Sequence, residues 1–200
     1  MKIYFDVCCL NRPFDDQGQE RIRFESEAVI TILGRCHSKT LTLLSSEIVD
    51  FEISKIPGED RKHKVMLLSS ISKMNIIIGD DIINRAKDLN NIGFKSFDAF
   101  HIACAEKGQA DVLLTTDDHL LKKAMSHTEF LKVRLENPLR WLMEELLSFA
   151  KVMEHYPFYY IPLTLPSPPT TRERKCIGIF RAACPPLSPN YGGEDKGEGV

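Results

Sequence analysis

Short apolar runs alternate with amphipathic segments along most of this chain. The runs are too short for helices, whereas the segments between them carry apolar residues at helical spacing. We therefore expect strands at 2–6, 40–46, 74–79, 111–116 and 130–135. We expect helices at 20–36, 46–56, 60–72, 80–91, 96–108, 117–125 and 137–149, with a polar loop at 8–19.

This order of elements predicts an α/β fold. Strands that read as continuous apolar runs are buried on both faces, and helices between them supply the crossovers that parallel strands need. The 200 residues are 43% hydrophobic, which suffices for one domain with a sizeable core. We expect a three-layer α/β/α domain with a central parallel sheet at residues 1–150.

The composition changes in the C-terminal quarter of the chain. Eight of the 11 prolines lie between Pro157 and Pro189, and this stretch shows neither helical nor strand periodicity. Such a composition buries too little apolar surface to offset the entropy of ordering the chain. We expect residues 151–200 to form a disordered tail rich in Pro and Gly.

Overall charge and hydropathy exclude several classes of protein. The 26 basic and 28 acidic residues give a net charge of -2, which argues against a broadly basic nucleic-acid binder. Attraction to a nucleic acid would therefore require local basic residues or bound cations. No apolar run reaches membrane-spanning length, and the N-terminus does not resemble a signal peptide. We expect a cytoplasmic protein with no membrane contact.

Cysteine spacing gives no sign of a zinc site. The six cysteines include no C-x-x-C pair and no set with zinc-finger spacing. We expect the first four to be reduced packing residues, because a free cysteine behaves as a small hydrophobe. These four are Cys8, Cys9, Cys36 and Cys104.

Four carboxylates fall where a parallel sheet places its ligands, outside the carboxyl ends of the strands. Asp6 ends the first strand and Asp117 follows a later one, while Asp98 lies in the first turn of a helix and Glu52 on another helix. Each also has a purely structural interpretation as a turn residue, a helix cap or a solvated side chain. Together they indicate a site for Mg²⁺ or Mn²⁺, which prefer carboxylate oxygens.

Four segments of the chain resemble PIN-domain proteins of the VapC toxin type. They span roughly residues 1–145 and read IYFDVCCLNRP, LSSEIVDFEI, SFDAFHIACAEKGQADVLLTTDDHLL and VRLENPLRWL. The third is the most specific, with an Asp-Ala-x-His-Ile-Ala helix followed by an apolar strand that ends in Thr-x-Asp. The resemblance implies a ribonuclease that hydrolyses RNA phosphodiesters with Mg²⁺ or Mn²⁺.

The same resemblance assigns the catalytic and metal-binding acids. They fall on Asp6, Glu52, Asp98 and Asp117, with Glu47 as the alternative to Glu52. Asp118 is the immediate neighbour of the fourth acid.

Two positions beside these acids bear on the site. Thr115 matches a Thr or Ser that supports the site in the family. Val7 departs from the family pattern, which often has Thr or Ser directly after the first acid, so one supporting hydrogen bond is in doubt.

Partners and alternatives follow from this resemblance. It implies an RNA substrate, a small antitoxin protein that shields the acidic cleft, and a homodimer. A degenerate PIN-like module that binds RNA or a protein without cleaving remains open, as does a flap-nuclease-like relative that cleaves DNA. A phosphatase is disfavoured, because the sequence after Asp6 lacks an Asp-x-Asp pair.

Several other side chains have two interpretations each. Arg12, Arg21, Arg23 and Lys95 either hold flanking phosphates or lie solvated on the surface. We expect His101 to pack or to support an acid instead of serving as a general base. We expect a core role for Phe97, Phe100, Cys104 and Trp141.

Overall fold

The computed structural model describes residues 1–155. The predicted disordered tail therefore lies outside the described residues, except for 151–155, which belong to the last helix. That helix runs past residue 149, where the sequence pattern had placed its end.

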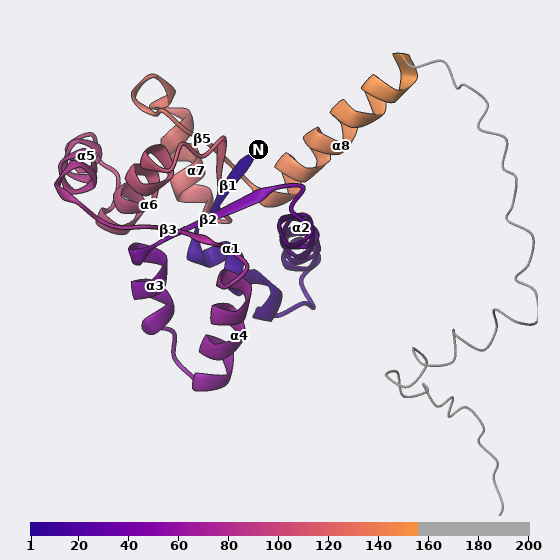
Figure 1. The fold of residues 1–200 in the computed structure, drawn as a ribbon, viewed down its shortest axis with the longest axis horizontal. Helices are drawn as coiled ribbons and strands as arrows, with labels where there is room; N and C mark the ends of the chain where they lie inside the picture. Colours follow the sequence, from indigo (N-terminus) through magenta and orange to yellow (C-terminus); the bar gives the residue numbers. More distant parts are fainter. Residues whose placement is uncertain (156–200) are drawn as a thin grey trace, which may run out of the picture. The chain divides into compact units, whose positions relative to one another are not determined.

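Five parallel strands form one sheet in the order β3-β2-β1-β4-β5 (Figure 1). The strands are β1 (Lys2–Phe5), β2 (Thr42–Ser46), β3 (Met74–Ile76), β4 (Val112–Leu114) and β5 (Arg134–Glu136). Helices flank this sheet, so the predicted α/β class with a central parallel sheet is confirmed.

Ten helical segments connect and cover the strands in the described part of the chain. They are α1 (Val7–Asn11), η1 (Arg12–Phe14), α2 (Glu20–His37), α3 (Glu47–Ser54), α4 (Glu59–Ser69), α5 (Asp80–Asn91), α6 (Ser96–Lys107), α7 (Asp118–Met125), η2 (Thr128–Phe130) and α8 (Pro138–His155). Most agree with the predicted helices to within a few residues.

Two local predictions were wrong. The predicted loop at 8–19 begins with the short helices α1 and η1, because Asp6 caps α1 through its side chain. The predicted strand at 130–135 is three residues long and pairs with β4 only from Arg134 to Glu136. Phe130 instead closes η2, where its backbone N–H donates to the carbonyl of His127 at 3.0 Å.

The strand order places a crevice beside β1. The chain leaves β1 to build β2 and β3 on one side and later returns to add β4 and β5 on the other. Ligand sites in open parallel sheets lie at such a reversal, outside the carboxyl ends of the two adjacent strands. Phe5 of β1 is in register with Leu114 of β4, so the residues that follow both strands meet there.

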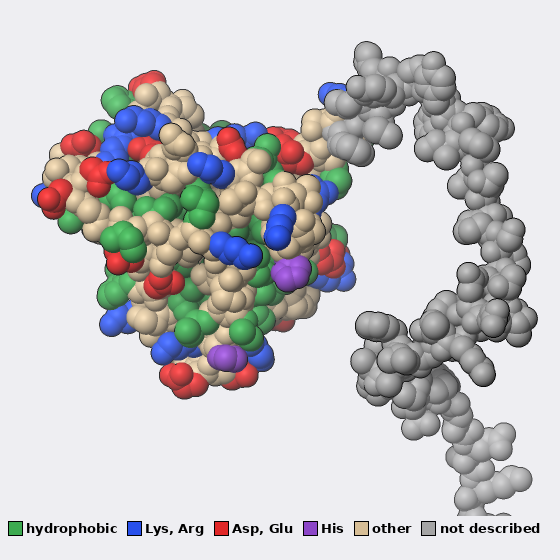
Figure 2. Space-filling model, viewed as in Figure 1, with side chains coloured by type: hydrophobic (Ala, Val, Ile, Leu, Met, Phe, Trp, Pro, Cys, Tyr) green, Lys and Arg blue, Asp and Glu red, His purple; other side chains and the backbone are tan. Residues whose placement is uncertain are grey.

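The surface carries no broad field of one sign on the face shown in Figure 2, where acidic and basic side chains are interspersed. This agrees with the near-neutral net charge of the chain. None of the helices among residues 1–155 has both the length and the apolar character needed to cross a membrane.

Candidate metal centre

Asp6 lies at the start of the crevice and is 8% exposed. Its backbone N–H continues the sheet by donating to the carbonyl of Leu114 at 3.0 Å. Its Oδ1 accepts a long hydrogen bond of 3.4 Å from the N–H of Cys8, which caps α1. The first strand therefore ends on a carboxylate that both begins a helix and faces β4.

A hydroxyl and a thiol hold the second oxygen of Asp6. Thr115 Oγ1 donates to Asp6 Oδ2 at 2.7 Å, and Cys8 Sγ donates to the same oxygen at 3.1 Å. Asp6 Oδ2 thus has two side-chain donors, Thr115 and Cys8, although Val7 offers no hydroxyl. Cys8 is partly exposed at this site, whereas Cys9, Cys36 and Cys104 are buried thiols as expected.

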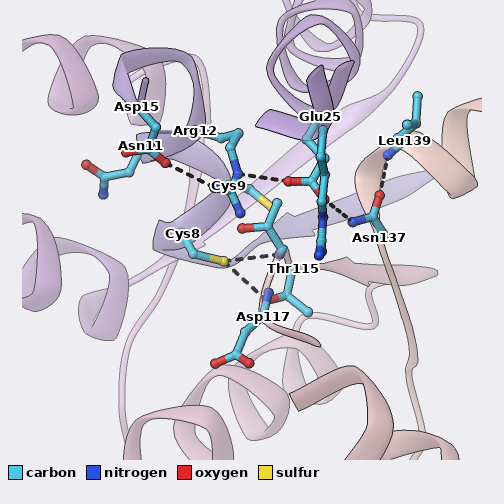
Figure 3. A network of polar contacts seen from close by, with 12 residues as sticks. Cys8, Cys9, Asn11, Arg12, Asp15, Glu25, Thr115, Asp117, Asn137 and Leu139 are labelled. Atoms are coloured by element: carbon cyan, nitrogen blue, oxygen red, sulfur yellow. Dashed lines mark hydrogen bonds and ion pairs between the residues drawn. The ribbon is translucent and has the colours of Figure 1, made fainter. Parts of the chain in front are cut away.

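Asp117 is joined to Asp6 through Thr115. Its N–H donates to Thr115 Oγ1 at 3.1 Å, and its Oδ1 accepts from the N–H groups of His119 and Leu120 at 2.7 and 3.2 Å. Asp117 therefore caps α7, and Figure 3 shows its carboxylate pointing away from Thr115 and Cys8. One hydroxyl fixes the relative positions of the acids that follow β1 and β4.

Asp118 has a different environment from its neighbour. It is exposed and receives two hydrogen bonds from Arg21, at 2.6 and 2.7 Å. This pair tightens α7 against α2 and leaves Asp118 outside the lining of the crevice.

Asp98 lies in the first turn of α6 and is partly buried. Burial and the negative charges of Asp6 and Asp117 raise the pKa of Asp98 to about 6, although Lys95 and His101 oppose the rise. Burial makes the largest contribution to this rise, and the two neighbouring acids add to it. Three acids from distant parts of the sequence therefore interact at one place.

Glu52 approaches the same place from α3. Its Oε2 lies 2.7 Å from Nε2 of His101, which is also 3.7 Å from Oδ1 of Asp6. The other ring nitrogen, Nδ1, bonds to the Tyr4 hydroxyl at 3.0 Å, and that hydroxyl lies 2.6 Å from Ser46 Oγ. A buried chain of polar groups from two strands thus fixes the imidazole that positions Glu52.

The charge of His101 matters to the acids around it. Burial alone would lower the pKa of His101, but the hydrogen bond to Glu52 and the charges of Asp6 and Asp98 raise it overall. Only 1% of the residue is exposed, so solvent does not screen this charge effectively. His101 is a buried side chain that supports an acid through its hydrogen bond to Glu52, as the sequence suggested.

Glu47, the alternative to Glu52, lies elsewhere on α3. Its Oε2 accepts a hydrogen bond of 2.8 Å from the backbone N–H of Ile78. It therefore anchors the segment that follows β3, while Glu52 lines the crevice.

The four predicted acids share one open hollow of about 470 Å³. Its walls also include Phe51 and Phe97, which the sequence pattern did not identify as site residues. Phe97 was expected in the core and is instead 47% exposed. Phe100 packs against the core, and Cys104 and Trp141 are buried in it, as expected.

Two of the four candidate phosphate contacts are committed to ion pairs. Arg12 and Arg21 both approach the buried carboxylate of Glu25, at 3.0 and 2.9 Å. Arg23 lies over the ring of Phe24, 5.2 Å from its centroid. Lys95 remains close enough to Asp98 to oppose the rise in its pKa.

The donor set suits a hard divalent cation. Four carboxylates line the hollow, and oxygen atoms of Asp6 and Glu52 lie within 4.8 Å of each other and of a ring nitrogen of His101. Nε2 of His101 is already bonded to Glu52, so the oxygens are the available ligands. Oxygen donors with uncompensated charge fit Mg²⁺ or Mn²⁺ better than a soft metal.

Comparisons with known proteins add the following. No protein-family model matches the sequence, and no curated protein matches it. One similar solved structure is the crystal structure of VapBC2 from Rickettsia felis bound to a DNA fragment from their promoter. The match has a TM-score of 0.47 and 16% identity, and it covers 68% of this chain and 98% of that chain. A likeness this weak carries no conclusion about activity, so function is inferred from the site itself.

Proposed function

We propose that the chain is a divalent-metal-dependent endoribonuclease of the toxin type. The observation that carries the proposal is that four carboxylates from distant parts of the chain, on Asp6, Glu52, Asp98 and Asp117, line one open hollow. The raised pKa of Asp98, caused by burial and by the charges of Asp6 and Asp117, supports it. A fold gains no stability from acids that repel each other, so the arrangement makes sense if a cation binds them.

Asp6, Asp98 and Asp117 would hold the cation, and Glu52 would complete the site. A bound Mg²⁺ or Mn²⁺ would lower the pKa of water and neutralise charge on a phosphodiester. Thr115 fixes the spacing of Asp6 and Asp117, with contacts of 2.7 and 3.1 Å. His101 orients Glu52, so the acids are held in place before a substrate arrives.

RNA as the substrate, a small antitoxin as a partner and a homodimer belong to the same proposal. They are supported by the resemblance of four sequence segments to PIN-domain toxins. An antitoxin that covered the hollow would block the acids from solvent and substrate.

Cleavage of unstructured RNA by the purified protein tests the proposal. We expect hydrolysis with Mg²⁺ or Mn²⁺ and none with excess chelator. Substituting a residue that supports a metal ligand usually lowers metal affinity or activity by about 10–100-fold. Asp98→Asn removes a proposed ligand itself, so we expect the cleavage rate to fall by at least that factor. The matched control is Asp118→Asn, which removes an acid that is exposed, bound to Arg21 and outside the hollow.

The outcomes separate the alternatives. Metal-independent cleavage, or equal loss in both variants, would contradict the assignment of Asp98. RNA binding by the wild type without any metal-dependent cleavage would favour the degenerate binding module.

A further inference from the structure

Two phenylalanines directly precede two of the acids in the hollow. Phe51 comes before Glu52 on α3, and Phe97 comes before Asp98 on α6. Adjacent residues on a helix point about 100° apart, so an acid that faces the hollow places the preceding side chain at its rim. The same dipeptide pattern on two helices brings two aromatic rings to one rim.

The rings meet there and remain accessible. Phe51 and Phe97 are 48% and 47% exposed, and both line the hollow. Their centroids lie 6.1 Å apart with an interplanar angle of 22°, which is a stacked pair. Stacked aromatic side chains are ordinarily found in cores or interfaces, where they bury much of their area. Here two helices assemble an aromatic shelf whose faces are partly left to solvent.

Positive charge adjoins this shelf. Lys55 Nζ lies 5.1 Å from the centroid of the Phe51 ring, and Lys55 also lines the hollow. Lys95 lies directly before α6 and is close to Asp98. The hollow thus combines acids that would bind a cation, an aromatic shelf and the side chain of Lys55, with Lys95 close to one of the acids.

We propose that Phe51 and Phe97 form a stacking shelf for an unpaired nucleobase of a single-stranded RNA. This inference rests on the proposed function, because the acids would bind the cation that receives a neighbouring phosphate. Lys55 is placed to contact a phosphate next to the stacked base. Proteins that bind single strands combine the same elements, aromatic faces for bases and positive charge for the backbone.

The chemistry of the hollow favours a base over a protein segment. An apolar peptide seated on the shelf would take the neighbouring acids out of water without neutralising them, which is costly. A nucleotide brings an aromatic face for the phenylalanines and a phosphate for the cation and Lys55. Bases in a duplex have no free face, so the shelf selects unpaired strands. Stacking accepts any base, so we expect weak sequence preference from the shelf itself.

Binding measurements separate this inference from catalysis. The ligand is a short unstructured RNA labelled at one end, and its anisotropy is followed with Ca²⁺ in place of Mg²⁺. Phe51→Leu and Phe97→Leu should each weaken binding by about 5- to 150-fold, the range for loss of one stacked base. Phe24→Leu is the control, since Phe24 is also exposed, at 43%, but lies on α2 outside the hollow. Thermal melts of all variants confirm that each is folded.

A second arm identifies the stacked base. A single abasic nucleotide is moved along the RNA, and one position should weaken binding to the wild type as much as Phe97→Leu does. At that position the abasic site and the substitution should not add, because both remove the same contact. If the effects of the abasic site and of Phe97→Leu on binding add fully at every position, the two changes remove separate contacts, and the proposed shelf is wrong.

The outcomes distinguish the shelf from the nuclease. Base-dependent binding that requires Phe51 and Phe97, without cleavage by the wild type, would support the shelf and refute the ribonuclease. Normal binding and cleavage by both variants would overturn the shelf and leave the ribonuclease standing. A change in oligomeric state by light scattering, with RNA binding unchanged, would overturn it in favour of a protein interface.

Discussion

Two buried carboxylates of this fold, on Glu25 and Asp6, have opposite surroundings. Glu25 on α2 is 2% exposed and Asp6 is 8% exposed. Glu25 lies between Arg12 and Arg21, and its Oε1 also accepts from Asn137 Nδ2 at 2.8 Å (Figure 3). Asp6 is held by a hydroxyl, a thiol and a backbone N–H, while other acids face it.

The difference separates a structural acid from a candidate functional one. Buried charges are ordinarily paired, because removal from water is costly without a counterion. Glu25 follows this rule, although Arg12 Nε lies 3.0 Å from Oε2 without hydrogen-bond alignment. The acids around Asp6 leave negative charge that His101 and Lys95 only partly oppose. Neutralising one acid should therefore have opposite effects in the two places.

The largest expected effect is at Glu25. Glu25→Gln leaves Arg12 and Arg21 without their shared carboxylate, and breaking a buried ion pair costs about 3–5 kcal/mol. We expect about 3 kcal/mol here, because Arg21 is substantially exposed and keeps Asp118 as a partner. Urea denaturation measures the loss. Glu27→Gln, at an exposed position on the same helix, is the control. Equal effects of the two substitutions would show that the ion pairs contribute nothing measurable.

Metal addition is the next largest effect and should act on the Asp6 side. A ligand that binds only the folded state stabilises it by about 2.7 kcal/mol at a hundredfold excess over its Kd. We expect this gain for the wild type with Mn²⁺, measured as a rise in Tm. Glu25→Gln should show the same gain, whereas Asp98→Asn should show much less. An equal gain in all three proteins would mean that Mn²⁺ binds elsewhere.

Asp98→Asn should stabilise the metal-free protein at pH 7. The folded pKa of about 6 exceeds the ordinary value of 3.8, so the folded state binds the proton more tightly than the unfolded state does. The stabilisation that this group gives the folded state is present at low pH and is lost as the pH rises from about 3.8 to about 6. The shift alone corresponds to about 3 kcal/mol. Partial exposure to solvent reduces the expected gain on substitution to about 1 kcal/mol.

Melts of wild type and Asp98→Asn at several pH values check this sign. The difference should be near zero at pH 4 and should reach its full size above pH 6. A variant that is less stable at pH 7, by about 0.3–1 kcal/mol, would mean that Asp98 serves the dipole of α6. The contrast with Glu25 would then disappear.

The topology explains why the sequence located these acids in the fold. Asp6 and Asp117 follow strands whose carboxyl ends are adjacent, and alternation of strands and helices is enough to predict that. Whether they bind metal stays a prediction. A supporting role for His101 was predicted, but its contact with Tyr4 could not be foreseen, because a contact between β1 and α6 has no local signature. The signal for α1 was present in Asp6 as a cap, but the helix is too short for periodicity to reveal it.

Phe97 shows a different limit of sequence patterns. Its spacing to Phe100 and Cys104 suggested one buried face. However, α6 is buried almost all round, with Ala99, His101, Ile102, Ala103, Cys104 and Ala105 in the core. When most positions of a helix are apolar, periodicity no longer identifies the exposed side. The exposure of Phe97 is decided by where α6 meets α3, which only the tertiary structure shows.

The smallest expected effect concerns Cys8, which supports Asp6 through an uncharged thiol. Cys8→Ala removes the thiol that donates to Asp6 Oδ2 at 3.1 Å and accepts from the N–H of Thr116 at 3.2 Å. A typical hydrogen bond contributes about 0.5–1.5 kcal/mol, and the thiol is a weak donor, so we expect a loss of about 0.5 kcal/mol. Mn²⁺ affinity should fall by about tenfold, the lower end for a group that orients a ligand.

Cys8→Ser is the matched variant, because its hydroxyl can donate to Asp6 in place of the thiol. We expect it to keep Mn²⁺ affinity close to that of the wild type, measured by titration calorimetry at pH 7. Cys36→Ala, which removes a buried thiol far from Asp6 in the sequence, should destabilise the fold without changing Mn²⁺ affinity. If Cys8→Ala and Cys8→Ser both bind Mn²⁺ as tightly as the wild type does, the side chain of Thr115 is enough to hold Asp6 Oδ2. Asp6 Oδ2 is then held by one side chain, Thr115, which directly follows β4, and not by two.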